Sequence, residues 1–88
     1  MSFFSVVVDP SAIKDLKRLK KSIPQLLPKL KKHFDSLSSD PYQGKPLAGN
    51  KKGCFSLREG DYRIIYEIHR DDKIVHIMAV GHRREIYR

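Results

Sequence analysis

The feature that most constrains this fold is a series of three β-prone segments in the second half of the chain, joined by turns of two residues. The segments span residues 54–59, 62–70 and 73–81, and each is rich in β-branched or aromatic side chains. The turns are residues 60–61 (Gly-Asp) and 71–72 (Asp-Asp). Because two-residue loops join antiparallel neighbours, we expect these segments to form an antiparallel meander.

A strand and a first helix are predicted ahead of the meander. Aromatic and β-branched residues predict a strand over residues 2–8, and the Asp9-Pro10 turn signal ends it. From residue 11 to about residue 21, apolar side chains recur at three-residue spacing between basic ones, which predicts an amphipathic helix. The apolar stripe of this helix consists of Ile13, Leu16 and Leu19.

A second helix follows, and two prolines leave its start open. Ser22 is a good N-cap residue, and the helix begins at Pro24 or at Pro28, because proline fits the first turn and disrupts later ones. Its apolar stripe consists of Leu26, Leu27, Leu30, Phe34 and Leu37. Glycines and prolines with little periodicity predict a loop over residues 38–53.

The order β-α-α-β-β-β predicts an α+β fold in which two N-terminal helices pack on a small, mainly antiparallel, twisted sheet. Residues 1–88 form a single domain, because a unit with its own core usually needs on the order of 100 residues. The longest apolar run, residues 6–8, is far below the roughly 20 residues that cross a bilayer, and no tripartite leader opens the chain. We expect a cytoplasmic protein with no membrane partner.

The charge of the chain predicts a polyanionic partner. The sequence has 18 lysines and arginines against 10 aspartates and glutamates, a net charge of +8. Of the seven arginines, Arg18 alone lies in the first half. Arginine offers a planar fork of donors that fits phosphate oxygens, so we expect the second half to carry the anion site. The alternative is a basic surface that merely keeps the protein soluble.

The cysteine and histidines predict no metal site. Cys54 is alone, so the chain has no CxxC or Cys/His set for zinc, and we expect neither a metal nor a cofactor. A small packing role fits this thiol best. His33, His69 and His76 are expected to be surface or cross-strand residues, and a two-residue turn at 71–72 places His76 opposite Glu67.

The strand register predicts an anion site. A two-residue turn at 60–61 sets Arg58 directly opposite Arg63, on the sheet face away from the helices. The other predicted pairs are Glu59–Tyr62, Leu57–Ile64 and Phe55–Tyr66. Opposed like charges destabilise a sheet by roughly 0.2–1 kcal/mol, so this pair calls for an anion. Glu59 points to the other face, which leaves an RNA phosphate or a partner's carboxylate; splaying of the arginines into water is the alternative.

The C-terminal residues add donors to the same region. Gly81 allows the backbone to turn after the last strand, and the tail then lies near Arg63. Arg83 and Tyr87 are therefore further candidates for the site. Tyr87 would stack on a base or donate its hydroxyl, as aromatic residues do with single-stranded RNA, or would pack on the sheet.

Two motifs resemble those of the RelE toxins of the RelE/ParE superfamily. They are GDYRIIYEI at residues 60–68 and VGHRREIY at residues 80–87. Residues 9–19 and 40–49 fit the same pattern, so the resemblance covers nearly the whole chain. It implies the toxin of a type II toxin-antitoxin pair, with the RelE-like α+β fold. It also implies a metal-independent endoribonuclease that enters the ribosomal A site and cleaves mRNA there, by attack of a 2′-hydroxyl on the adjacent phosphate.

The resemblance also implies roles for individual residues. Arg63 matches the strand arginine that contacts the scissile phosphate, and Arg83 matches the arginine proposed as acid or charge stabiliser. Tyr87 matches the tyrosine that orients the substrate, and Arg58 matches a further basic position. Further RNA contacts are expected from Lys45, Lys51, Lys52, His82 and Arg84.

One departure from the family pattern concerns the general base. Well-known bacterial members carry two strand lysines where this chain has Cys54 and Ser56. Lys51 and Lys52 lie just upstream and are candidates to replace them. His82 is another candidate for the base, because its unperturbed pKa of about 6.5 suits proton transfer near neutrality. The alternative is a structural role as a hydrogen-bonded histidine in the turn.

The sequence is also compatible with two other functions. One is a ParE-like inhibitor that binds DNA gyrase without RNA chemistry. The other is an inactive member that binds only its antitoxin and operator DNA, for which the net charge of +8 suffices. All three predict an acidic, partly disordered antitoxin that wraps the basic surface and lays an amphipathic helix into an apolar groove. The nuclease alone requires the ribosome and mRNA as partners.

Overall fold

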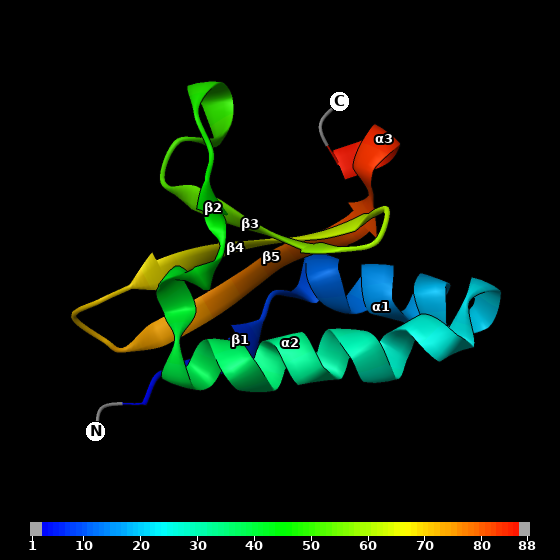
Figure 1. The fold of residues 1–88 in the computed structure, drawn as a ribbon, viewed down its shortest axis with the longest axis horizontal. Coiled ribbons are helices and arrows are strands. Elements are labelled where there is room, and N and C mark those ends of the chain that lie inside the picture. Colours follow the sequence, from blue (N-terminus) through cyan, green and yellow to red (C-terminus); the bar gives the residue numbers. More distant parts are fainter. Residues whose placement is uncertain (1–2, 87–88) are drawn as a thin grey trace.

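The computed structural model describes residues 3–86 and builds them around a five-stranded sheet in the order β1-β5-β4-β3-β2. The strands are β1 (Ser5–Val8), β2 (Lys45–Pro46), β3 (Cys54–Glu59), β4 (Tyr62–His69) and β5 (Ile74–His82). The helices are α1 (Pro10–Ser22), α2 (Leu27–Ser39) and α3 (Arg83–Ile86), and the 3-10 turns are η1 (Pro24–Leu26), η2 (Pro41–Gln43) and η3 (Gly49–Lys51). Both long helices cover one face of the sheet (Figure 1). The predicted α+β fold is therefore confirmed.

The predicted meander and its register are confirmed. In the pairing of β3 with β4, Arg58 is opposite Arg63, and the three other predicted pairs are also present. His76 is opposite Glu67 in the pairing of β4 with β5, and a bulge interrupts that ladder between Ile65 and Tyr66. The β-branched and aromatic residues of these strands thus set both the strands and their alignment.

Two pairings at the sheet edges lie outside the prediction. β1 pairs in parallel with β5 and makes one edge. At the other edge β2 pairs with β3, although residues 38–53 were expected to be a loop. A strand of two residues is too short to show alternation in the sequence. Its Pro46 cannot donate a hydrogen bond to the ladder, but proline is tolerated at the edge of a sheet.

The first helix begins earlier than predicted, and one of its predicted core positions is wrong. Asp9 caps α1 by accepting a hydrogen bond from the Ser11 amide at 3.0 Å. Its hydrogen bonds with Ser11 lower the pKa of Asp9. Ile13, predicted to be in the core, is 42% exposed, whereas Ala12 is fully buried. Leu16 and Leu19 do face the core as predicted, so Ala12 takes the inward position at the start of the helix in place of Ile13.

The second helix is split by its two prolines. Pro24 begins η1, and Pro28 lies in the first turn of α2, where a missing N–H costs nothing. Ser22 is not the N-cap that we expected: it is the last residue of α1, and its hydroxyl donates to the Arg18 carbonyl. The helix also runs on to Ser39, past the predicted loop boundary.

The core lies between the two long helices and one face of the sheet. Its fully buried members include leucines of α2 and alternate residues of β4 and β5, with Tyr66 the largest. The buried residues are Ala12, Leu19, Leu26, Leu30, Leu37, Ile64, Tyr66, Val75, Ile77 and Val80. Each fully buried aliphatic side chain contributes about 1.5–3 kcal/mol. The core therefore fixes the sheet and leaves its other face uncovered by α1 and α2.

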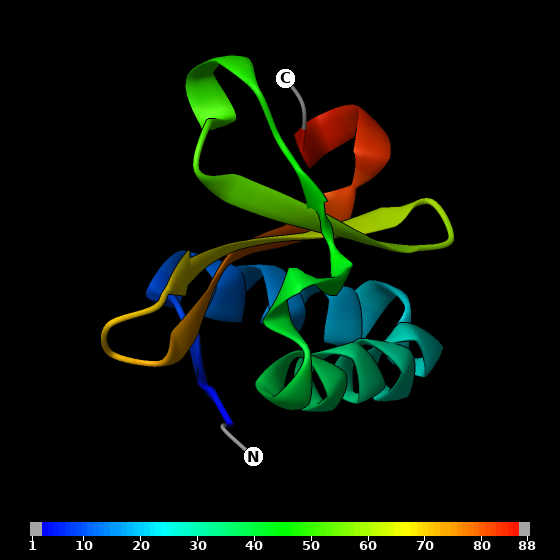
Figure 2. The same cartoon turned by 60° about the vertical axis from the view of Figure 1, so that its left-hand side comes forward.

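The opposite face of the sheet is framed by two short segments. The stretch that contains η3 and the terminal α3 rise on the side of the sheet away from α1 and α2 (Figures 1 and 2). We call the face between them the open face; it carries Arg58 and Arg63. Within residues 3–86, no helix is both long and apolar enough to cross a membrane.

Candidate functional site

A pocket of about 550 Å³ lies at the Arg58–Arg63 pair of the open face. Its lining comes from β2, β3, β4 and the residues around β2: Gln43, Lys45, Leu47, Ser56, Leu57, Arg58 and Arg63. Three of these side chains are cationic, and none is acidic among the residues that the structure describes. The pocket therefore has the charge and the donors that an anion requires.

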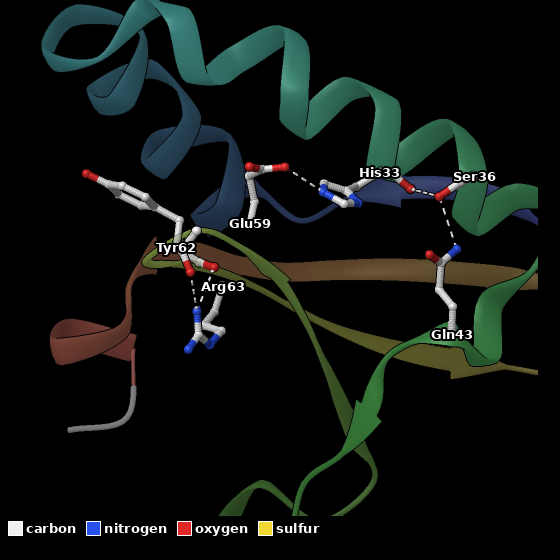
Figure 3. A network of polar contacts seen from close by, with 7 residues as sticks. His33, Ser36, Gln43, Glu59, Tyr62 and Arg63 are labelled. Carbon is white, nitrogen blue, oxygen red and sulfur yellow. Dashed lines mark hydrogen bonds and ion pairs between the residues drawn. The ribbon is translucent and has the colours of Figure 1, made fainter.

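The two arginines differ in how firmly they are held. The Nη1 atom of Arg63 donates to the carbonyl oxygens of Gly60 and Tyr62, both at 3.1 Å, so this guanidinium is fastened to its own hairpin turn (Figure 3). Arg58, on the facing strand, is exposed, and no ion pair of its side chain is recorded in the described part of the chain. One donor fork is thus preorganised, and the other is free to close on a ligand.

The nearest strand carboxylate is engaged elsewhere, as the register predicted. Glu59 Oε1 lies 2.8 Å from His33 Nε2 on α2, on the helix-covered side of the sheet (Figure 3). This contact ties the β3–β4 hairpin to the helix layer. It also keeps a negative charge away from the arginine pair, so the positive potential of the pocket is not neutralised from within.

Lys45 reaches the pocket through the unpredicted strand β2. It is directly opposite Ser56 in the ladder, and residues directly opposite share a sheet face. Ser56 is one of the two strand positions at which the resemblance stated in the sequence analysis implies a lysine. The chain thus brings an amine to this face from the neighbouring strand, although the sequence pattern gave Lys45 no fixed position.

The buried tyrosine of β4 holds the β2 segment in place. The Tyr66 hydroxyl donates to the Pro41 carbonyl at 2.8 Å and accepts from the Gly44 amide at 3.0 Å. Burial raises the pKa of Tyr66, so the hydroxyl stays protonated. Gln43 lies between these anchors and lines the pocket; a single glutamine in an expected loop gave no sequence signal for this position.

The described part of the C-terminal segment lies beside the arginine hairpin. The Arg83 amide donates to the Asp61 carbonyl at 2.8 Å, and Arg83 Nε lies 3.9 Å from Asp61 Oδ1. Arg83 therefore contacts the same turn whose Gly60 carbonyl holds Arg63. Arg84 is exposed, with its amide donating to His82 Nδ1 at 3.2 Å. Tyr87 lies outside the described residues.

Three other predicted site residues lie away from the pocket lining. His82 is opposite Tyr62 in the β4–β5 ladder and packs edge-on against its ring at 5.5 Å, in a second pocket of about 250 Å³ on the helix-covered side. Lys51 ends η3, and Lys52 follows it; neither lines the main pocket. Of all the predicted site residues that the structure describes, Lys45, Arg58 and Arg63 line the main pocket together.

The thiol of Cys54 is an unsuitable nucleophile. Burial raises its pKa, and the negative charge of Glu67, directly opposite on β4, acts in the same direction. A thiol kept protonated is poorly reactive. This agrees with the packing role expected from the sequence.

The fold and the site define a small basic α+β protein with a cationic pocket on the open face of its sheet. A family model described as the ParE toxin of type II toxin-antitoxin systems, parDE, matches residues 6–87. The chain is 33% identical to Toxin RelE of Mycobacterium tuberculosis over 86 residues, which cover 97% of this chain and 87% of that protein. The chain belongs to the ParE toxin family, within the RelE/ParE superfamily of type II toxin-antitoxin toxins.

Further relatives and solved structures are consistent with this family assignment. The chain is 45% identical to Toxin RelG of M. tuberculosis over 56 residues, but these span 62% of this chain and 64% of RelG, less than two thirds of its length. The RelBE2 toxin-antitoxin complex of M. tuberculosis contains a chain that superposes with a TM-score of 0.82 at 33% identity, covering 91% of this chain and 98% of that one. A mutant of YafQ from E. coli shares the fold alone: TM-score 0.81, 23% identity, 97% of this chain and 99% of that one.

Proposed function

We propose that this toxin is a ribosome-dependent endoribonuclease that cuts mRNA in the A site. The observation that carries the proposal is the pocket in which Arg58, Arg63 and Lys45 face one another without a carboxylate in the lining. The relatives named RelE and RelG support it, because they match 97% and 62% of this chain.

The proposed chemistry is transfer of a phosphate to its own ribose. The 2′-oxygen attacks the adjacent phosphorus, the bond from phosphorus to the 5′-oxygen breaks, and a 2′,3′-cyclic phosphate is left. Arg63, fixed on its turn, and Arg58 stabilise the negative charge that grows on the phosphoryl oxygens. Lys45, the third cation of the described lining, adds to this charge stabilisation, and the proton of the 2′-hydroxyl passes to water. Arg83, beside the same turn, protonates or stabilises the leaving oxygen.

We further propose a cognate antitoxin as partner. The net charge of +8 and the cationic open face fit an acidic segment that lies across the pocket and blocks it. Operator DNA would then be bound by the toxin-antitoxin complex. The cytoplasm, where ribosomes translate mRNA, is the proposed site of action.

Cleavage of mRNA on programmed ribosomes tests the activity. We expect Arg63→Ala to reduce single-turnover cleavage by about 10²–10³-fold, the usual effect of removing one preorganised charge stabiliser. The matched control is Arg70→Ala, because Arg70 is exposed at the far end of β4, over the Tyr42 ring, and does not line the pocket. Equal cleavage by wild type and Arg63→Ala would reject this site, provided that both variants bind the antitoxin.

Inhibition of DNA gyrase is the second candidate, favoured by the match to the ParE family model. It requires no RNA chemistry at the pocket. Purified toxin would then block supercoiling by gyrase and leave mRNA intact on programmed ribosomes. The reverse pattern is expected from our proposal.

A further inference from the structure

A second cluster of polar side chains lies on the same sheet face as the arginine pair, at the other end of β4. Glu67 and His69 are two residues apart on β4 and so point to one face, and His76 is directly opposite Glu67 on β5. None of the three lines the pocket that we assign to RNA. From Arg63 to Glu67 the chain advances four residues, about 13 Å along the strand, so the two sites are separate.

The ligand atoms of this cluster converge on one point. His69 Nε2 lies 3.3 Å from Glu67 Oε1, and His76 Nδ1 lies 4.0 Å from the same oxygen. One ligand atom from each residue lies within 4.8 Å of the other two. Zinc-ligand bonds of about 2.0–2.2 Å place neighbouring ligand atoms of a tetrahedral site roughly 3.3 Å apart. Small side-chain rotations therefore suffice to close these three groups around one ion.

The second nitrogen of His76 is already oriented for metal binding. His76 Nε2 lies 3.2 Å from Asp9 Oδ1, and Nδ1 lies on the side of Glu67. In the neutral tautomer that donates Nε2–H to this carboxylate, Nδ1 carries the lone pair that a metal ion requires. Asp9 is itself fixed, because its Oδ2 atom accepts from the Ser11 amide at 3.0 Å and the Ser11 hydroxyl at 2.7 Å. A carboxylate that holds the distal nitrogen of a ligating histidine is the usual outer partner in zinc sites.

We propose that Glu67, His69 and His76 form a site for a divalent transition-metal ion, with Zn²⁺ as the expected ligand and Asp9 as the outer carboxylate. Two imidazoles and one carboxylate suit Zn²⁺, whereas Mg²⁺ and Ca²⁺ prefer oxygen ligands alone. The expectation of no metal site rested on the missing Cys/His set and treated His69 and His76 as surface or cross-strand residues. The ion would join β4 to β5 and, through Asp9, to the start of α1.

The consequence is a fold that zinc stabilises independently of the RNA site. A ligand that binds only the native state stabilises it, and this stabilisation grows with the logarithm of the ratio of ligand concentration to Kd. The unfolding temperature should therefore rise as zinc is added. The effect requires ordered strands, because the three side chains meet only when β4 and β5 are paired.

Zinc titration of the full, untagged chain tests the site, with calorimetry for stoichiometry and thermal unfolding for linkage. We expect one Zn²⁺ per chain, a higher Tm with Zn²⁺ and no shift with Mg²⁺. His76→Gln should abolish the Tm shift. Asp9→Asn should weaken zinc binding about 10–100-fold. The reason is that the NH₂ group of asparagine replaces one of the two accepting oxygens, so a donor then faces either His76 or Ser11.

The matched control is His33→Gln, which removes a histidine paired with Glu59 on the helix-covered side of the sheet. This variant should bind zinc like the wild type. Three results would each overturn the proposal: no zinc binding by the folded wild-type chain, unchanged binding in His76→Gln, or equal loss in His33→Gln. Circular dichroism of each variant without metal shows that it is folded, so a loss of binding is not a loss of structure.

Discussion

The hydroxyl of Tyr66 connects the core to the pocket, and Tyr66→Phe removes it alone. The ring is fully buried, so the variant opens no large cavity. It breaks the hydrogen bonds to the Pro41 carbonyl and from the Gly44 amide, at 2.8 and 3.0 Å. Each bond contributes about 0.5–1.5 kcal/mol net, so we expect a loss of roughly 2 kcal/mol in the free energy of unfolding.

The thermal shift follows from the size of the domain. For 60–100 residues, about 1 kcal/mol moves Tm by about 4–8 °C, so the variant should unfold about 8–16 °C lower than the wild type. The Gly44 amide should also exchange its hydrogen faster, because its acceptor is gone. Scanning calorimetry and hydrogen exchange measure these two effects.

The control for this variant is Tyr42→Phe. That ring is 48% exposed, and we expect a change within about 0.5 kcal/mol. Burial raises the pKa of Tyr66, so ionisation in the unfolded chain lowers the stability of the wild type as pH rises above about 10. Tyr66→Phe should show a weaker decline there. An unchanged Tm in Tyr66→Phe would refute the claim that this hydroxyl anchors the β2 segment.

Three further predictions concern the same region. Gly44→Ala should destabilise the fold, because the added Cβ would collide with the Tyr66 hydroxyl and come within 3.0 Å of the Ser56 carbonyl oxygen. Chemical unfolding measures the loss of stability, and a variant as stable as the wild type would contradict this packing. Replacing His33 and Glu59 by alanine, singly and together, should give a coupling energy of about 0.5–1.5 kcal/mol for their 2.8 Å contact, and strict additivity would show that the contact contributes nothing. Lys45→Ala should slow mRNA cleavage at unchanged Tm, because the residue is exposed, and full activity would remove it from the site.

The meander could be predicted because its signals are local. β-branched runs and two-residue turns set the strands, and counting across the 60–61 turn was enough to place Arg58 opposite Arg63. The helix-covered face followed from period-two alternation. Those parts of the pocket therefore needed no tertiary information.

The rest of the pocket depends on contacts between distant segments. Lys45 joins it through a strand of two residues, which the Tyr66 hydroxyl holds from within the core. No periodicity marks so short a strand. The zinc cluster is an intermediate case: the opposition of His76 and Glu67 was predicted, but the role of Asp9 depends on where α1 begins against the parallel β1–β5 edge.

The central claim is that the pocket of Arg58, Arg63 and Lys45 directs a ribose 2′-hydroxyl at its neighbouring phosphate. The most direct measurement uses ribosomes programmed with mRNA that carries a single 2′-deoxy nucleotide at the mapped cleavage position in the A site. Our account predicts that wild-type toxin binds these ribosomes but leaves the mRNA intact, while the all-ribose mRNA is cut to a 2′,3′-cyclic phosphate end. Cleavage of the deoxy-substituted mRNA at the same position and rate would contradict it.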